Sequence, residues 1–258
     1  MAYQIYLPSP SLSNFIKYYW HLELGAASTH VERVIPSGEP QLIFHYKTPF
    51  CEVSAHQKVQ HQPLSLICGQ HTVYRDITST EAVGVLAAVL QPYALSVFMP
   101  QPINDFTNLG VALEHIFPHE NAELQDQFTQ ADGIRARISI VEAFLYKHIA
   151  IQPHLAVVKA AVDAVTSTQG HILIADLANH LNMSQRQLER VFKAVVGLTP
   201  KTFARIVRLQ TAIQQIHNVD SLTSLSYEAG YFDQAHLIHE FRQFTGFTPK
   251  MFFQQDCL

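Results

Sequence analysis

The sequence predicts an α+β fold, in which a β-rich barrel-like or sandwich-like domain precedes an all-α domain. Short apolar runs broken by turn residues fill the first 110 residues, and helical apolar spacing takes over from about residue 111. In the last third of the chain, a twelve-residue phrase, F-[KR]-x3-G-[LF]-T-P-K-x-F, occurs twice with a displacement of 49 residues. This part therefore holds two copies of one supersecondary unit.

Composition and charge limit the classes of protein to which this sequence can belong. Of the 258 residues, 48% are hydrophobic and 15% charged, which allows a sizeable core and argues against disorder. The net charge is −4, with −5 on residues 1–169 and +1 on residues 170–258. A non-specific polyanion binder would be far more basic, so a nucleic-acid partner would have to be selected largely through base-edge contacts.

No membrane segment or leader is expected. No apolar run approaches the ~20 residues that a membrane helix needs, and the N-terminus lacks the charged start and long apolar region of a signal peptide. We therefore expect a cytoplasmic protein.

Five strands are expected in the N-terminal region, because runs rich in Val, Ile, Phe and Tyr are bounded there by Pro, Gly or Ser. They cover Val31–Pro36, Gln41–Tyr46, Leu64–Gly69, Thr72–Ile77 and Ala82–Leu90. A short helix is expected at Ser11–Trp20. Their spacing suits a β-barrel or sandwich.

Two helices are expected after these strands. Apolar residues recur at helical spacing from Ile134 to His148 and again from Leu155 to Val165. Gln152-Pro153 separates the two stripes, so the domain boundary is expected near residue 150. We expect residues 1–150 to form the β-rich domain with trailing helices and residues 151–258 to form the all-α domain.

The first repeated unit has the pattern of a helix-turn-helix. Ile174–Leu181 is a short amphipathic stretch, and Ser184 with Gln187 satisfies a capping box that begins a second helix. Leu188 and Phe192 face inward in that helix. Its outward side chains are Gln185, Arg186, Glu189, Arg190 and Lys193. In a helix-turn-helix, the N-terminal half of the second helix enters the major groove of DNA.

The second unit repeats this arrangement with a turn one residue longer. Asp233 is the expected N-cap of its second helix, in which Leu237 and Phe241 match Leu188 and Phe192. The outward candidates are Gln234, Ala235, Ile238, His239 and Arg242.

The repeated Thr-Pro-Lys begins a further helix in each copy. Thr199 and Thr248 are the expected N-caps, and proline suits the first helical position, where no N–H is needed. The helix from Pro200 to Ile216 would span roughly 25 Å. A helix of that length can hold two recognition helices about one DNA turn, ~34 Å, apart.

These segments resemble the DNA-binding domain of AraC/XylS-type transcriptional regulators. The resemblance runs from about Leu155 to Gln255 and covers both units. It rests on Asp176-Leu177-Ala178, Arg190–Lys193, Gly197–Pro200, Ala229–Tyr231 and Gly246–Pro249. Residues 1–150, with Tyr19-Trp20 and Val34–Gly38, also look like the N-terminal domain of an uncharacterised subgroup of that family.

The resemblance implies a regulator that binds double-stranded DNA and is not an enzyme. It implies an N-terminal domain that senses a small effector, mediates homodimerisation, or both, and contact with RNA polymerase if the protein activates transcription. No cofactor is implied. The expected base contacts are Gln185, Arg186, Glu189, Arg190, Gln234, Ala235, Ile238 and His239. The candidate phosphate contacts are Ser184, Lys193, Lys201, Arg242 and Lys250.

The alternative hypothesis places a metal-binding or enzymatic β-barrel, or a pure interaction module, in the N-terminal domain. It rests on six histidines, His21, His30, His45, His56, His61 and His71. Because no H-x-H or H-E-x-x-H spacing occurs, scattered histidines and no metal are the favoured interpretation. We find no catalytic signature beside them.

Cysteines and aromatic residues in the N-terminal region suggest two further roles. Cys51, Cys68 and Cys257 are odd in number and lack metal-type spacing, so reduced, inert thiols are expected. Trp20, Phe44, Tyr46 and Tyr74 are candidates to line an effector pocket, although aromatic residues on strands more often belong to a core.

Overall fold

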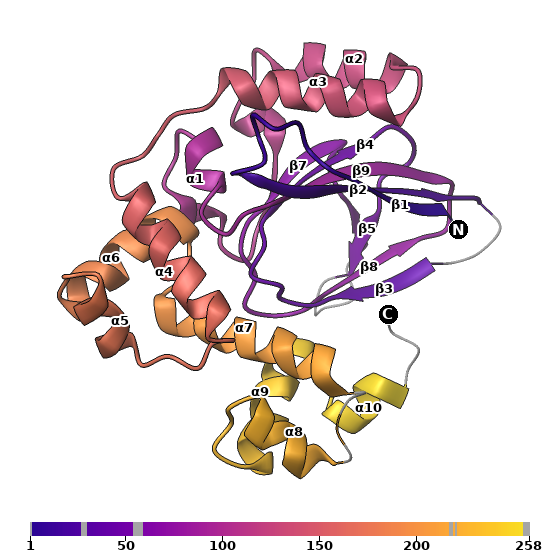
Figure 1. The fold of residues 1–258 in the computed structure, drawn as a ribbon. Coiled ribbons are helices and arrows are strands. Elements are labelled where there is room, and N and C mark those ends of the chain that lie inside the picture. Colours follow the sequence, from indigo (N-terminus) through magenta and orange to yellow (C-terminus); the bar gives the residue numbers. More distant parts are fainter. Residues whose placement is uncertain (1, 27–29, 54–58, 217–218, 220, 255–258) are drawn as a thin grey trace.

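Two antiparallel sheets form an N-terminal β-sandwich in the computed structural model, which describes residues 2–26, 30–53, 59–216, 219 and 221–254 (Figure 1). One sheet has the strand order β1-β2-β9-β4-β7-β10 and the other β3-β8-β5-β6. The strands are β1 Ala2–Tyr6, β2 Ile16–Leu24, β3 His30–Val34, β4 Gln41–His45, β5 Cys51–Val53, β6 Val59–His61, β7 Ser65–Cys68, β8 Arg75–Ser79, β9 Val83–Leu90 and β10 Gly110–Ala112. The β-rich, sandwich-like prediction is confirmed.

The expected helix at Ser11–Trp20 is wrong. A turn ends near Phe15, and β2 then runs antiparallel between β1 and β9, with Tyr19 opposite Ala88. This strand contains three consecutive aromatic residues, Tyr18, Tyr19 and Trp20, and it lies inside the larger sheet with neighbours on both sides. Pairing with those two strands outweighs any local helical preference.

Other strand predictions differ from the structure at their ends. The strand expected at Thr72–Ile77 begins only at Arg75 and continues to Ser79, so Tyr74 lies before it. Strands β1, β5, β6 and β10 were not predicted. The last three have only three residues each and are defined by their pairing partners rather than by their own pattern, and β1 pairs with β2, where a helix was expected.

Short helices cover the six-stranded sheet, and α2 and α3 lie side by side over it in Figure 1. These elements are α1 Leu95–Phe98, η1 Ile103–Phe106, η2 Leu113–His115, α2 Asn121–Gln130 and α3 Ile134–Lys147. Phe128 of α2 contacts Phe44 of β4 with ring centroids 5.3 Å apart. One hydrophobic cluster continues from this sheet through α3 into the C-terminal helices, and a second fills the space between the sheets.

The C-terminal part is all-α, as predicted. Its helices are α4 Leu155–Ser167, α5 Ile174–His180, α6 Gln185–Val196, α7 Pro200–Gln215, α8 Leu222–Glu228, α9 Gln234–Thr245 and α10 Pro249–Gln254. Among the described residues, no helix combines the length and the apolar character needed to span a membrane.

His45 gives the sandwich a pH-dependent stability. The ring is fully buried on β4, its Nδ1 lies 3.2 Å from the Pro63 carbonyl oxygen, and burial lowers its pKa to about 4. The unfolded chain, with a histidine pKa of about 6.5, therefore binds more protons than the folded chain between pH 6.5 and pH 4. The stabilising contribution is complete above pH 6.5 and is lost as the pH falls.

We expect the free energy of unfolding to be lower at pH 5.5 than at pH 7.5 by roughly 1.4 kcal/mol on account of His45 alone. Burial also lowers the pKa of His71, to about 3, so wild-type protein loses more than this. Urea unfolding of wild type and His45→Asn at both pH values measures the difference, since asparagine keeps a donor for Pro63 without titrating. Equal pH dependence in the two proteins would contradict this account.

Candidate nucleic-acid interface

The first unit forms the predicted helix-turn-helix from α5 and α6. Ser184 caps α6 with both halves of a capping box: its Oγ accepts the Gln187 N–H at 3.3 Å, and its own N–H donates to Gln187 Oε1 at 3.1 Å. Leu188 and Phe192 are fully buried, so α6 has one fixed face inward. The opposite face is thereby held toward solvent.

The candidate base contacts of α6 lie on that solvent face. Gln185, Arg186 and Arg190 are exposed, whereas Glu189 is half-buried. Gln185 Nε2 donates to Glu189 Oε1 at 3.0 Å, which orients this carboxylate along the helix. The two arginines therefore stand beside a Gln–Glu pair in the first turns of α6.

The second unit, α8 and α9, presents a matching surface. Asp233 caps α9 as predicted, with Oδ1 accepting the His236 N–H at 2.7 Å. Gln234, Ala235 and His239 are exposed, and Ile238 is half-buried. Gln234 Oε1 accepts a hydrogen bond from the Thr223 hydroxyl of α8 at 3.2 Å, which fixes the amide near the helix start.

Helix α7 joins the two units. Thr199 caps it by accepting the Thr202 N–H at 3.1 Å, with Pro200 at the first position, as predicted. Its link to α9 was not apparent from the sequence. Arg205 bonds the carboxylate of Glu240, which is only 5% exposed, and also donates to Gln243 Oε1 at 2.6 Å. The residue at the position of Glu240 in the first copy is the apolar Val191.

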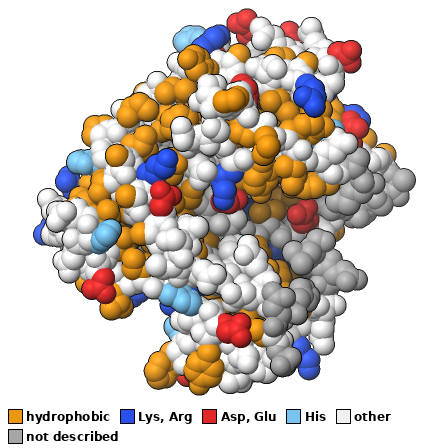
Figure 2. Space-filling model, viewed as in Figure 1, with side chains coloured by type: hydrophobic (Ala, Val, Ile, Leu, Met, Phe, Trp, Pro, Cys, Tyr) orange, Lys and Arg blue, Asp and Glu red, His pale blue; other side chains and the backbone are white. Residues whose placement is uncertain are grey.

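The candidate phosphate contacts are accessible but sparse. Lys193, Lys201, Arg242 and Lys250 are exposed, whereas the hydroxyl of exposed Ser184 already donates to Gln187 Oε1 at 2.9 Å. On the face drawn in Figure 2, Lys and Arg side chains stand singly among other types and form no continuous band. On this face, few positive charges are therefore available for binding a polyanion.

The N-terminal histidines whose side chains the structure describes, His21, His45, His61 and His71, do not converge. His21 Nε2 lies 2.6 Å from the Tyr46 hydroxyl, His61 Nδ1 lies 3.4 Å from Cys51 Sγ, and His71 is half-buried beside Arg75. His56 lies outside the described residues, as does the side chain of His30. Within the described part of the chain, no three His, Cys, Asp or Glu side chains are grouped to hold a metal ion.

The cysteines have neighbours that sequence spacing could not indicate. Cys68 is buried, and Arg75 donates to its Sγ at 3.5 Å across the sandwich. Burial raises the pKa of the Cys68 thiol despite this guanidinium, and burial followed by Glu81 raises that of Cys51. Both shifts favour the neutral thiol. Cys257 lies outside the described residues.

The four aromatic candidates for an effector pocket are absent from the linings of the two pockets found among the described residues. Phe44 is in the core, and Tyr46 contacts Arg137, whose guanidinium lies 4.0 Å from the ring centroid. Trp20 donates to Gln41 at 3.2 Å, and Tyr74 lies at the surface beside α9. Phe44 and Tyr46 both contact the ring of Phe128, at 5.3 and 6.2 Å between centroids.

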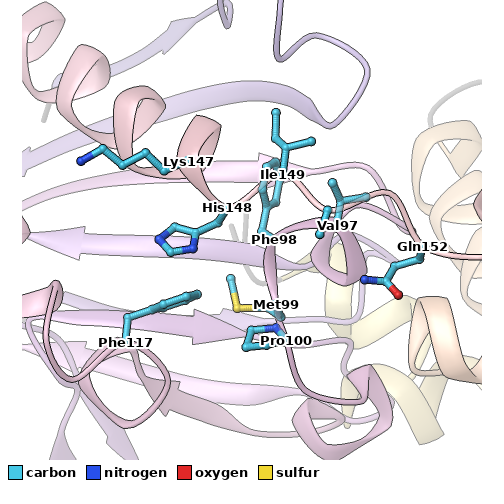
Figure 3. Close-up of a pocket in the computed structure, with 10 residues that line it drawn as sticks. Val97, Phe98, Met99, Pro100, Phe117, Lys147, His148, Ile149 and Gln152 are labelled. Atoms are coloured by element: carbon cyan, nitrogen blue, oxygen red, sulfur yellow. The ribbon is translucent and has the colours of Figure 1, made fainter.

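A pocket of about 280 Å³ lies elsewhere, where α1 meets the end of α3 (Figure 3). Phe98, Met99 and Phe117 give it an apolar wall, and His148 faces the same space. His148 Nε2 is 2.9 Å from Glu120 Oε2. Helix α1 also contacts α6, so one wall of this pocket adjoins the first recognition helix.

Fold and surface together define a helix-turn-helix protein with two solvent-facing recognition helices. Two family models match the chain: "Domain of unknown function (DUF6597)" over residues 4–112 and "Helix-turn-helix domain" over residues 177–255. The second match covers both α6 and α9, the helices whose outward residues are described above.

Two curated relatives each match a little under a third of this chain. The Lactose operon transcription activator of Staphylococcus xylosus is 32% identical over 78 residues, which are 30% of this chain and 28% of that protein. The HTH-type transcriptional regulator ArgR of Pseudomonas aeruginosa is 30% identical over 76 residues, which are 29% and 23%. The matches thus span about a quarter of each relative's length.

Solved structures give weaker likenesses. ToxT from Vibrio cholerae is 9% identical over 98% of each chain, with a TM-score of 0.46. A transcriptional regulator with an AraC-type DNA-binding domain from Chromobacterium violaceum is 24% identical over 39% of this chain and 91% of the other, with a TM-score of 0.36. Neither score supports a further argument.

Residues 177–255 thus match a helix-turn-helix DNA-binding domain of the AraC type, and residues 4–112 match the DUF6597 model. Both curated relatives are named as regulators of transcription.

Proposed function

We propose that this protein regulates transcription by binding a specific bipartite duplex sequence through residues 151–258. The observation that carries the proposal is the pair of exposed recognition faces on α6 and α9, each held by a buried opposite face and joined through α7. Two units on one helix suit two successive major grooves, which implies a site of roughly 17–20 base pairs.

Different side chains would select the bases in each half-site. Arg186 and Arg190 on α6 suit guanine, whose O6 and N7 accept both ends of a guanidinium. Gln234 on α9 suits adenine, and Ile238 offers only an apolar contact, for example with a thymine methyl group. The two halves of the site should therefore differ in sequence.

Selection from a random duplex pool, followed by Arg186→Ala, tests this proposal. We expect wild-type protein to enrich a two-part motif, and the variant to lose ~1–3 kcal/mol of binding free energy while accepting any base at one position. Lys193→Ala is the matched control, because loss of a phosphate contact weakens binding to all sequences uniformly. If wild type enriches no motif, the proposal fails.

We further propose that the N-terminal region modulates DNA binding, through a small effector or through dimerisation. Contacts of α6 with η1 and with α1 support this, since they connect the N-terminal region to a recognition helix. A thermal-shift screen against metabolites, with sedimentation of the free protein, separates the two routes. A stable monomer without any ligand shift would exclude both.

A further inference from the structure

Each copy of the repeated phrase ends its recognition helix with a glycine that contacts the N-terminal region. Gly197 ends α6 and Gly246 ends α9, both with left-handed backbone (φ 88° and 77°). A Cβ on Gly197 would lie 3.2 Å from Thr107 Oγ1, and one on Gly246 would lie 2.6 Å from the Tyr74 ring. The shared glycine thus allows close approach of the N-terminal region at both positions.

The contact at the second unit centres on Arg33 of β3. Its guanidinium donates to the Thr245 carbonyl oxygen at 3.2 Å, in the last turn of α9. It lies between two rings, 3.9 Å from the centroid of Tyr74 and 4.2 Å from that of Phe247. Asp76 accepts two further hydrogen bonds from Arg33, at 2.6 and 2.7 Å, and so fixes the orientation of the guanidinium.

This geometry suits the end of a helix. The last carbonyl oxygens of a helix lack intrahelical donors, and a cation there interacts favourably with the helix dipole. Arg33 is only 19% exposed as a side chain, and its stacked, bidentate arrangement leaves it little freedom. The β-sandwich therefore holds the C-terminal end of α9 in one place.

The first unit and the joining helix are held separately. Thr107 Oγ1 donates to the Gly197 carbonyl oxygen at 2.8 Å, and Gln210 of α7 donates to the Pro36 carbonyl oxygen at 2.7 Å. Consequently α6, α7 and α9 each have their own contact with the N-terminal region. Loss of one contact can loosen one unit without releasing the other.

None of these contacts covers the candidate base-reading residues. Arg186, Arg190, Gln234 and His239 remain exposed at the N-terminal halves of α6 and α9, whereas the N-terminal region contacts the C-terminal ends of both helices. A contact at the far end of a recognition helix orients it and leaves its reading face free. The N-terminal region thus holds both helices without covering their candidate base-reading residues.

We propose that Arg33, on the β-sandwich, is a positioning residue for base recognition by α9. This inference rests on the proposed DNA-binding function. Arg33 does not contact DNA itself; it sets the direction of α9 through Thr245 while the first unit is placed by Thr107. Its removal therefore weakens recognition of the α9 half-site specifically.

The test measures binding of full-length protein to two duplexes, the selected operator and the same operator with the α9 half-site scrambled. Arg33→Gln should weaken operator binding about tenfold, because a loosely held second module has a lower effective concentration at its half-site. Binding to the scrambled duplex should stay at the wild-type value. Arg33→Lys, which keeps a charged donor for Thr245, should recover part of the loss.

Two variants serve as matched controls. Arg135→Gln removes one positive charge from the exposed surface of α3 and should leave both duplexes unaffected. Thr107→Val removes the equivalent contact of the first unit and should weaken recognition of the α6 half-site instead. Urea unfolding of each variant separates loosened docking from loss of the fold.

Three outcomes would overturn the inference: equal losses on both duplexes, unchanged binding in Arg33→Gln, or tighter operator binding, which would make the contact inhibitory. Failure of the proposed DNA-binding function would give a different result, since wild-type protein would then select no operator at all. Tyr74→Ala, which removes one of the two rings beside Arg33, provides a second variant if Arg33→Gln does not fold.

Discussion

Arg205→Met should lower the free energy of unfolding by about 3–5 kcal/mol, because it leaves the carboxylate of Glu240 buried without its main partner. Glu240 is 5% exposed, and its other basic neighbours are more distant, with Arg208 at 3.8 Å and His236 at 3.6 Å. Since Arg205 lies on α7 and Glu240 on α9, the loss should fall on the junction between the joining helix and the second unit. Urea unfolding at pH 7.5 measures it.

The first copy of the unit suggests the control for this prediction. Its apolar Val191 stands where the second copy has Glu240, so this position tolerates an apolar residue. We expect Arg205→Met combined with Glu240→Val to recover most of the lost stability, as replacement of a whole buried ion pair by apolar groups often costs little. A double variant as unstable as the sum of the two single ones would contradict a pairwise interaction.

The second large effect is expected on DNA affinity. Arg186→Ala together with Arg190→Ala should cost about 3–5 kcal/mol of operator binding, since we propose one bidentate base contact for each arginine. Both side chains are exposed on α6 and neither supports the core, so the fold should be unaffected. Fluorescence anisotropy with operator and with random duplex measures the loss.

A pair of phosphate candidates gives the matched control for the double arginine variant. Lys193→Ala with Lys201→Ala removes the same charge but should weaken operator and random duplex alike, with a smaller salt dependence of binding. The arginine variant should lose most of its preference for operator. If both pairs reduce binding equally on both duplexes, α6 does not read bases.

The helix-turn-helix units could be predicted closely from sequence because their determinants are local. The capping box of Ser184 and Gln187, the Asp233 cap and the Thr199-Pro200 start each depend on residues within one helical turn. The structure places every one of these caps at the predicted residue. The outward faces follow from the buried positions, such as Leu188 and Leu237.

Features set by distant pairing could not be predicted in this way. Strand β2 was expected to be partly helical, because its neighbours β1 and β9 are not apparent from its own sequence. Arg33 and Thr245 are separated by 212 residues, and Arg205 and Glu240 by 35. No periodicity or motif connects such residues, so the docking of the C-terminal units on the β-sandwich emerges only from the fold.

The most direct test of the account is the helical phasing of the selected site. The two half-sites of the selected motif are moved apart by 5 or by 10 base pairs, and protection by full-length protein is measured by DNase footprinting. We expect that 5 added base pairs abolish simultaneous protection of both half-sites, because the second major groove then faces away from the protein. With 10 added base pairs, both grooves again lie on the same side of the duplex. Binding should still be weaker than to the unaltered site, because the fixed length of α7 does not span the larger separation. Equal protection at all spacings, or protection of a single half-site in the unaltered operator, would contradict a rigid pair of recognition helices.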